Sequence, residues 1–207
     1  MINEPKETRA YELRIQLDDI KPVIWRSVVV PSGITLDRLH DVIQIAMGWL
    51  DYHLHLFKID GRRFSEAPTE DGFGFDDDDD DEALVRLNEV LKNEKAKFSY
   101  VYDFGDDWRH TVTLTRIIDI PDGHVMRMQC LDGKRARPPE DVGGLPGFER
   151  FREAINDKNH PEHEHYRCWY GGRFYPNRFR IDEVNEELTK YHRWSRNRPV
   201  PWPSRVE

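Results

Sequence analysis

The chain has 207 residues and a formal net charge of −8, and this length suits one domain that can bury a sizeable core. Two cysteines are too few for a disulfide framework, and no apolar run is long enough to span a membrane. The first ten residues lack the apolar segment of a secretion signal, so we expect a cytoplasmic protein with reduced thiols. The acidic balance disfavours broad contact with a nucleic-acid backbone, although a local basic patch would still allow such contact.

The first part of the sequence predicts two strands followed by a helix. Apolar and polar residues alternate over 11–17, which is typical of a half-buried strand, and the β-branched run 23–30 predicts a second strand. The segment 36–47 places apolar residues on one helical face, with Thr35 as N-cap and Gly48 as the stop. The other face of this helix carries the polar side chains Asp37, His40, Asp41 and Gln44.

Two further strands are expected, one at 53–59 and a short one after the turn that follows it. Strand, strand, helix, strand and strand in this order resembles a β-grasp arrangement, in which a mixed sheet packs on one helix. We therefore predict an α+β fold with a mixed or antiparallel sheet. The Asp-rich segment 67–82 cannot build a core and is expected to form a loop, in which the run 76–81 binds cations only loosely.

The rest of the sequence predicts a further hairpin and then helices. Strands at 97–103 and 108–117 are joined by a short turn, a weaker strand is expected at 125–131, and a Pro/Gly-rich loop follows at 132–147. Helical or turn-like segments are expected around 84–91, 148–155, 160–172 and 181–194. We predict a single domain over 1–207, with a sheet-and-helix core at 11–118, a loop and helical part at 119–192, and a frayed tail at 193–207.

The stretch YVYDFGDDWRH at 100–110 has two interpretations. As the turn of a hairpin, its aspartates bond nearby backbone amides, Gly105 takes a positive φ, and Trp108 lies beneath the sheet. As a functional site, its acids and its histidine converge as metal ligands or as an acid–base set. The hairpin interpretation accounts for every residue, whereas the second requires the turn to curl back. The residues of the second interpretation are Asp103, Asp106, Asp107 and His110.

Three other groups of residues are candidates for binding. His53 and His55 alternate on one predicted strand and could present two imidazoles to a metal, with His40 or His110 as a third ligand. A second group, the loop GKRARPPED, combines Lys134, Arg135 and Arg137 with Glu140 and Asp141, so it could hold a phosphate or a carboxylate, or pair internally. The third is the tail, in which Arg193, Arg196 and Arg198 surround Trp194 as a modest basic–aromatic patch for nucleic acid.

Four segments together resemble a known family. They are WRSVVVPSGITLDRLHDVIQIAMGWLDYHLHLF, YVYDFGDDWRHTV, CLDGKRARPPEDVGG and FYPNRFRIDEVNEEL. They look like the Ri-plasmid pRiA open-reading-frame-three family, whose relatives also occur as passenger proteins of insertion elements, some with a resolvase label. The resemblance implies an α+β fold and no characterised activity. Relatives often carry cysteine where Arg137 and Val142 stand, so a thiolate metal site with Cys130 would lack ligands here.

These observations predict a non-enzymatic cytoplasmic binding or accessory module of the mobile-element type. No cofactor is predicted, and a divalent metal ion is the one cofactor that the sequence leaves open. The expected partner is a protein or a nucleic acid and not a membrane. The first alternative is a metal-dependent hydrolase or nuclease that uses the 103–110 cluster, and the second is a weak DNA-binding accessory protein. The predicted interaction surface is the rim formed by the 103–108 turn and the loop after it in sequence, with Trp108, Arg137, Glu140 and Asp141 as its binding residues.

Overall fold

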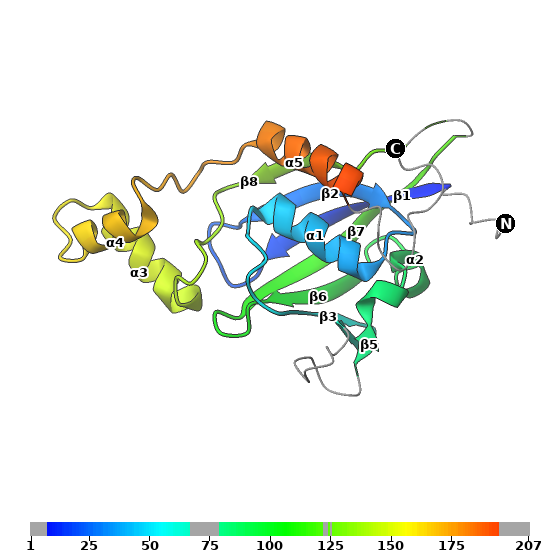
Figure 1. The fold of residues 1–207 in the computed structure, drawn as a ribbon, viewed down its shortest axis with the longest axis horizontal. Helices are drawn as coiled ribbons and strands as arrows, with labels where there is room; N and C mark the ends of the chain where they lie inside the picture. The colour runs from blue at the N-terminus through cyan, green and yellow to red at the C-terminus, as the bar shows by residue number, and fades with distance from the viewer. Residues whose placement is uncertain (1–7, 67–78, 122–123, 125, 195–207) are drawn as a thin grey trace.

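The computed structural model describes residues 8–66, 79–121, 124 and 126–194, and within them the main chain forms one mixed sheet with helices on it (Figure 1). The strands lie in the order β5-β4-β3-β6-β7-β1-β2-β8, and the neighbours are antiparallel except for β4 and β5. The strands are β1 Arg9–Leu17, β2 Trp25–Pro31, β3 His55–Ile59, β4 Arg62–Ser65, β5 Asp80–Asp81, β6 Lys97–Tyr102, β7 Trp108–Asp119 and β8 Gln129–Lys134. The predicted α+β class and its mixed sheet are confirmed.

The described residues also form five α-helices and one 3₁₀ turn. They are α1 Leu36–Met47, the 3₁₀ turn η1 Glu82–Leu84, α2 Leu87–Val90, α3 Gly144–Asn156, α4 His163–Tyr170 and α5 Ile181–Trp194. Figure 1 shows α1 in front of the sheet and α5 along β8, while α3 and α4 lie together at one end of the molecule. The predicted C-terminal helices are therefore confirmed, although α4 begins three residues after His160.

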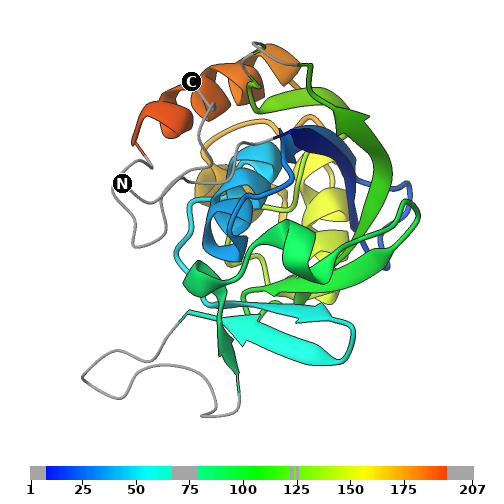
Figure 2. The same ribbon diagram turned by 90° about the vertical axis from the view of Figure 1, so that its right-hand side faces the viewer.

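The predicted order of two strands, a helix and two strands is confirmed as β1, β2, α1, β3 and β4. The two hairpins of this unit do not pair with each other, because the later hairpin of β6 and β7 lies between β3 and β1. Figure 2 shows the resulting curved sheet wrapped around α1. Strands far apart in sequence thus become neighbours, which a pattern of local periodicity cannot reveal.

Helix α1 departs from the expectation of one buried and one polar outer face. Asp37, His40 and Gln44 on its polar side are all less than 9% exposed. The sheet covers the apolar side of α1, and the helix also contacts η1 and α5. The polar side chains on this face therefore bond to protein groups, as buried polar groups generally do.

The Asp-rich segment is only partly a loop. Asp80 and Asp81 form β5, which runs parallel to β4, and the Asp81 side chain accepts a hydrogen bond from the amide of Ala83 at the start of η1. Residues 67–78 lie outside the described part of the chain. No helix among the described residues is both long enough and apolar enough to cross a membrane.

Candidate functional site

The turn between β6 and β7 is a hairpin connection built around Asp103. The Asp103 carboxylate accepts hydrogen bonds from the amides of Gly105 and Asp106, at 2.9 and 3.3 Å, and the Asp103 carbonyl accepts one from the amide of Asp107 at 2.6 Å. The predicted positive φ at Gly105 is wrong, since Asp103 and Asp107 take positive φ instead, both at 55°. Aspartate tolerates this conformation better than most residues. A Cβ at Gly105 would lie 3.2 Å from the Asp103 carboxylate, a tight contact that this carboxylate would have to relieve by a small shift.

The loop before α3 packs directly on this turn. The Asp106 carboxylate accepts a hydrogen bond from the amide of Gly143 at 3.2 Å. A Cβ on Gly144, which has a φ of 63°, would lie 2.7 Å from the Asp106 carbonyl oxygen. Glycine is therefore required where the two backbones approach so closely. The predicted rim of turn and loop exists as a contact between two segments about 40 residues apart in the sequence.

A third segment, the connection from α1 to β3, completes the rim. Arg137 donates to the Gly48 carbonyl at 2.6 Å, and the amide of Leu50 donates to the Glu140 carboxylate at 2.8 Å. The indole of Trp49 also donates to the carbonyl of Pro138 at 3.2 Å. These bonds hold residues 48–53 against the loop at 137–143.

One ligand atom from each of the three segments meets at this rim. His53, Asp103 and Asp141 each offer an atom, and the three atoms lie within 4.8 Å of one another. His53 Nε2 is 3.0 Å from Asp141 Oδ1 and 3.7 Å from Asp103 Oδ2. The three burial classes differ, with Asp103 buried, His53 half-buried and Asp141 exposed, so one side of the group is open to solvent. We call these three residues the rim triad.

The His53 nitrogen in the rim triad is buried, and its contact with Asp141 lacks hydrogen-bond geometry. A second group of similar composition, His40, Asp41 and Asp51, differs in this respect. There, His40 Nε2 lies 2.8 Å from Asp51 Oδ1 and its Nδ1 lies 2.7 Å from the hydroxyl of Tyr100. The second group is thus satisfied within the protein, whereas the rim triad presents a nitrogen and two carboxylates to a shared space.

The other residues of the proposed 103–110 cluster do not join the rim triad. Asp107 forms an ion pair with Arg109 at 2.6 Å on the outer face of β7. His110 is fully buried on the opposite face, where its Nδ1 lies 3.3 Å from the carbonyl of Tyr100. Burial lowers the pKa of His110 to about 4, so the ring is neutral. Asp103 is therefore the only one of the four that belongs to the triad, since Asp106 accepts a hydrogen bond from Gly143, Asp107 pairs with Arg109 and His110 is buried.

Trp108 and His55 occupy the interior. The prediction that Trp108 lies beneath the sheet is confirmed, since it is 3% exposed and packs against Trp49 and Phe148. Its place among the predicted rim-binding residues is therefore corrected, because a buried indole cannot contact a partner. His55 does not share a ligand position with His53, since it stacks on His40 and lies 2.8 Å from Glu82.

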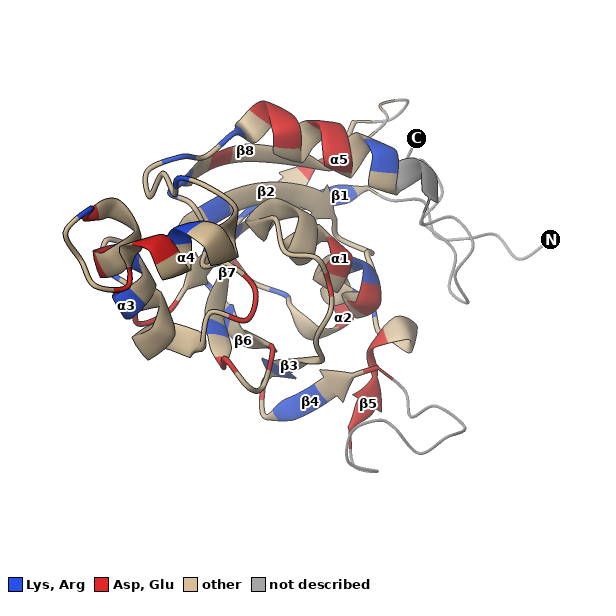
Figure 3. Cartoon of the chain, turned by 60° about the vertical axis from the view of Figure 1, so that its left-hand side comes forward, with Lys and Arg blue, Asp and Glu red and all other residues tan. Residues whose placement is uncertain are grey.

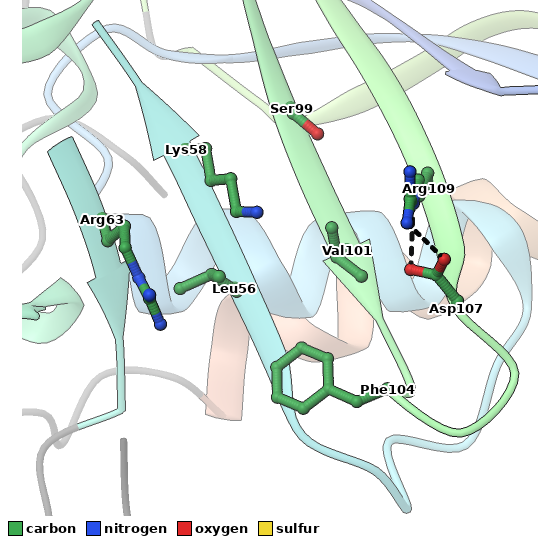
Figure 4. A pocket seen from close by; sticks show the side chains of 8 residues that line it. All are labelled: Leu56, Lys58, Arg63, Ser99, Val101, Phe104, Asp107 and Arg109. Carbon is green, nitrogen blue, oxygen red and sulfur yellow. Dashed lines mark hydrogen bonds and ion pairs between the residues drawn. The ribbon is translucent and has the colours of Figure 1, made fainter. Parts of the chain in front are cut away.

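A hollow of about 410 Å³ lies on the outer face of the sheet beside the turn (Figure 4). Phe104 and Asp107 of the turn line it, and Lys58 and Arg63 reach into it from β3 and β4. Arg109 lies in its wall with its charge paired to Asp107. The turn thus borders both the rim triad and this hollow.

The sequence named all three members of the rim triad, although it placed them in separate hypotheses. No sequence signal joins them, because they come from three segments whose contact depends on the glycines at 143 and 144. The thiolate site considered with Cys130 finds no support, since burial raises the pKa of that thiol to about 11. In the basic tail, Arg196 and Arg198 lie outside the described residues, and the side chains of Arg193 and Trp194 are not described either.

Comparisons with known proteins agree with the resemblance found in the sequence. The family model described as plasmid pRiA4b ORF-3-like protein matches residues 9–183. The "Uncharacterized protein y4hQ" of Sinorhizobium fredii is 37% identical over 164 residues, which are 79% of this chain and 81% of that protein. The crystal structure of the protein of unknown function MM3350 from Methanosarcina mazei Go1 is 34% identical, with a TM-score of 0.75 over 86% of this chain and 98% of that one. The chain therefore belongs to the plasmid pRiA4b ORF-3-like family.

Proposed function

We propose that this protein is a binding module whose rim holds a divalent transition-metal ion through His53, Asp103 and Asp141. The observation that carries the proposal is the buried His53 Nε2, which faces two carboxylates without a hydrogen bond to either. An ion bonded to nitrogen and oxygen at about 2.1 Å sets its ligand atoms roughly 3–3.5 Å apart. The separations of 3.0 and 3.7 Å around His53 Nε2 bracket that range.

The donor set selects the class of metal. One imidazole and two carboxylates suit zinc, manganese or iron better than calcium or magnesium, which prefer oxygen ligands alone. Three protein ligands leave a position for water or for a partner group, as catalytic zinc sites do.

The role that we propose is recruitment rather than hydrolysis. The open ligand position lies beside exposed Asp141, where a carboxylate or histidine of a partner protein could complete the metal shell. A metal-dependent hydrolase also needs an acid or base within reach of substrate, and His110, the histidine of the 103–110 cluster, is fully buried. The family description supports an association with plasmids, and a cytoplasmic accessory role in mobile elements remains a prediction.

Metal analysis of protein purified without chelator tests the proposal. We expect stoichiometric metal in the wild-type protein and loss of it in His53→Gln and Asp141→Asn, because each substitution removes one ligand. Asp107→Asn is the matched control, since Asp107 belongs to the same turn but pairs with Arg109. In thermal melts, added zinc or manganese should raise the melting temperature of the wild type and of the control, but not that of the two ligand variants. Metal that stays bound in both ligand variants, or no metal uptake by the wild type, would contradict the proposal.

A further inference from the structure

A second cavity contains none of the rim-triad residues and is lined by several arginines. It has a volume of about 340 Å³ and lies between the end of α1, the loop at 136–137, the end of α4 and the first half of α5. Five arginines and two glutamates line it, in a protein whose formal net charge is −8. Figure 3 shows Lys and Arg on the connection between α4 and α5. The arginines are Arg26, Arg137, Arg173, Arg178 and Arg180.

The floor of this cavity holds a positive charge that no carboxylate of the described residues pairs with. Arg26 is 2% exposed and donates to the carbonyls of Trp25, Ala46, Lys134 and Arg135 at 2.8–3.0 Å. Its guanidinium also lies 4.2 Å from the ring centre of Phe179. Neutral carbonyls fix the side chain in place but leave its charge, which can then act on a ligand in the cavity.

Arg137 supplies a second cation with donors to spare. It donates through Nε to Gly48 and through Nη1 to Pro138, so its Nη2 has no partner among the described residues. Burial lowers the pKa of both Arg26 and Arg137. The charge of Arg137 lowers the pKa of Arg26 further, whereas the Glu140 carboxylate partly offsets the effect of burial on Arg137. Two guanidinium groups that repel each other favour an anion between or above them.

The acids of the cavity do not balance these charges. Glu187 is paired at 2.8 Å with Lys190, a residue that does not line the cavity. Glu183 is shared by Arg178 at 3.7 Å and Arg180 at 3.4 Å, which are long contacts between exposed groups. Such surface pairs contribute little stability and can be exchanged for a ligand anion.

Aromatic rings stand beside the arginines. Tyr170 at the end of α4 is 40% exposed and Tyr175 is 50% exposed, and both line the cavity. Arg173 lies 5.1 Å from the ring centre of Tyr175 and has no ion pair among the described residues. Exposed tyrosines next to cations are the combination that stacks a nucleobase and holds its phosphate.

We infer that this cavity binds a nucleoside phosphate, with the phosphate on the arginines and the base against Tyr170 or Tyr175. Its volume suits a small ligand rather than a long strand, because cavities for small molecules begin near 300 Å³. None of the three rim-triad residues lines this cavity, although Arg137 and Gly48 belong to both the cavity wall and the rim. The arginines that form it come from β2, the loop at 136–137 and the α4–α5 connection, which only the tertiary structure brings together.

Calorimetric titration of the full chain with ADP, pyrophosphate, adenosine and a single-stranded oligonucleotide tests this inference. We expect saturable binding of ADP, and binding weaker by at least about tenfold for adenosine and for pyrophosphate, because each lacks one of the two recognised groups. Arg173→Gln should weaken ADP binding by about tenfold, the effect of losing one charge-assisted hydrogen bond. Tyr175→Ala should weaken ADP binding and leave pyrophosphate binding unchanged. Both side chains are exposed, so the variants should fold.

Arg167→Gln is the matched control, since Arg167 is exposed on α4 and does not line the cavity. ADP binding should be the same in this variant and in the wild type. The inference is overturned if ADP shows no saturable binding, or if Arg173→Gln binds ADP as well as the control does. Pyrophosphate that binds as tightly as ADP would overturn the role of the base. Oligonucleotide that binds more tightly than ADP would identify a nucleic-acid surface instead.

Discussion

The buried ring of His110 should make folding stability depend on pH in a defined window. A histidine in water has an ordinary pKa of 6.5, and burial lowers the pKa of His110 in the folded protein to about 4. Between these values the unfolded chain takes up a proton that the folded chain cannot bind, so acid favours unfolding. The stabilising effect of neutral His110 is fully present above about pH 6.5 and is lost as the pH falls toward 4. The opposite sign would apply to a histidine with a raised pKa.

The size of this effect follows from the separation of the two pKa values. That separation is about 2.5, and each pKa unit corresponds to about 1.4 kcal/mol, so the ring accounts for roughly 3 kcal/mol between neutral pH and pH 4. His110→Phe keeps a ring of similar size that cannot ionise. The free energy of unfolding of the wild type should therefore fall by a few kcal/mol more than that of His110→Phe over this range. The absolute stability of the variant at neutral pH is not the readout, since the variant also loses the bond to Tyr100.

Urea denaturation followed by tryptophan fluorescence, at several pH values and constant ionic strength, measures this difference. His165→Phe is the control, because His165 is exposed on α4 and stays in water in both states. Its stability profile should follow that of the wild type. If the profiles of the wild type and His110→Phe were parallel between neutral pH and about pH 4, the argument that burial keeps His110 neutral would be refuted.

Three substitutions test the packing around the rim. Trp108→Ala should lower the free energy of unfolding by roughly 3–5 kcal/mol, because the indole is 3% exposed. Asp107→Asn should cost about 1 kcal/mol or less, since it removes an exposed ion pair and asparagine tolerates the positive φ at this position, and thermal melts that rank the two variants the other way would contradict the hairpin interpretation. Gly147→Ala should cost about 3 kcal/mol or more, because a Cβ there would lie 1.9 Å from the Val142 carbonyl oxygen. The same melts check this, with Glu149→Ala on the exposed side of α3 as a near-neutral comparison, and a fully stable Gly147→Ala would show that the loop can move away.

Local pattern by itself determined most of the secondary structure and the hairpin. Alternation over 11–17 predicted β1, and the apolar face of 36–47 predicted α1 with its end at Gly48, because each pattern depends only on neighbouring residues. The turn chemistry of 103–107 was also readable, since aspartate bonds backbone amides within a few residues. The position of positive φ was not readable, because aspartate and glycine both tolerate positive φ and the turn contains both.

Tertiary structure alone decided which polar residues meet. The rim triad joins residues about 50 and 40 positions apart, and the arginine cavity joins β2 with the connection before α5. The polar face of α1 is buried because other elements cover it, so His40 and Gln44 both bond the hydroxyl of buried Tyr100 although the helical pattern alone marks that face as polar. Hydrophobic periodicity records which face of one element is apolar, but it carries no information on which distant element packs there. The contacts that create both candidate sites are therefore properties of strand order and close backbone approach, and the sequence displays them only as scattered aspartates, glycines and arginines.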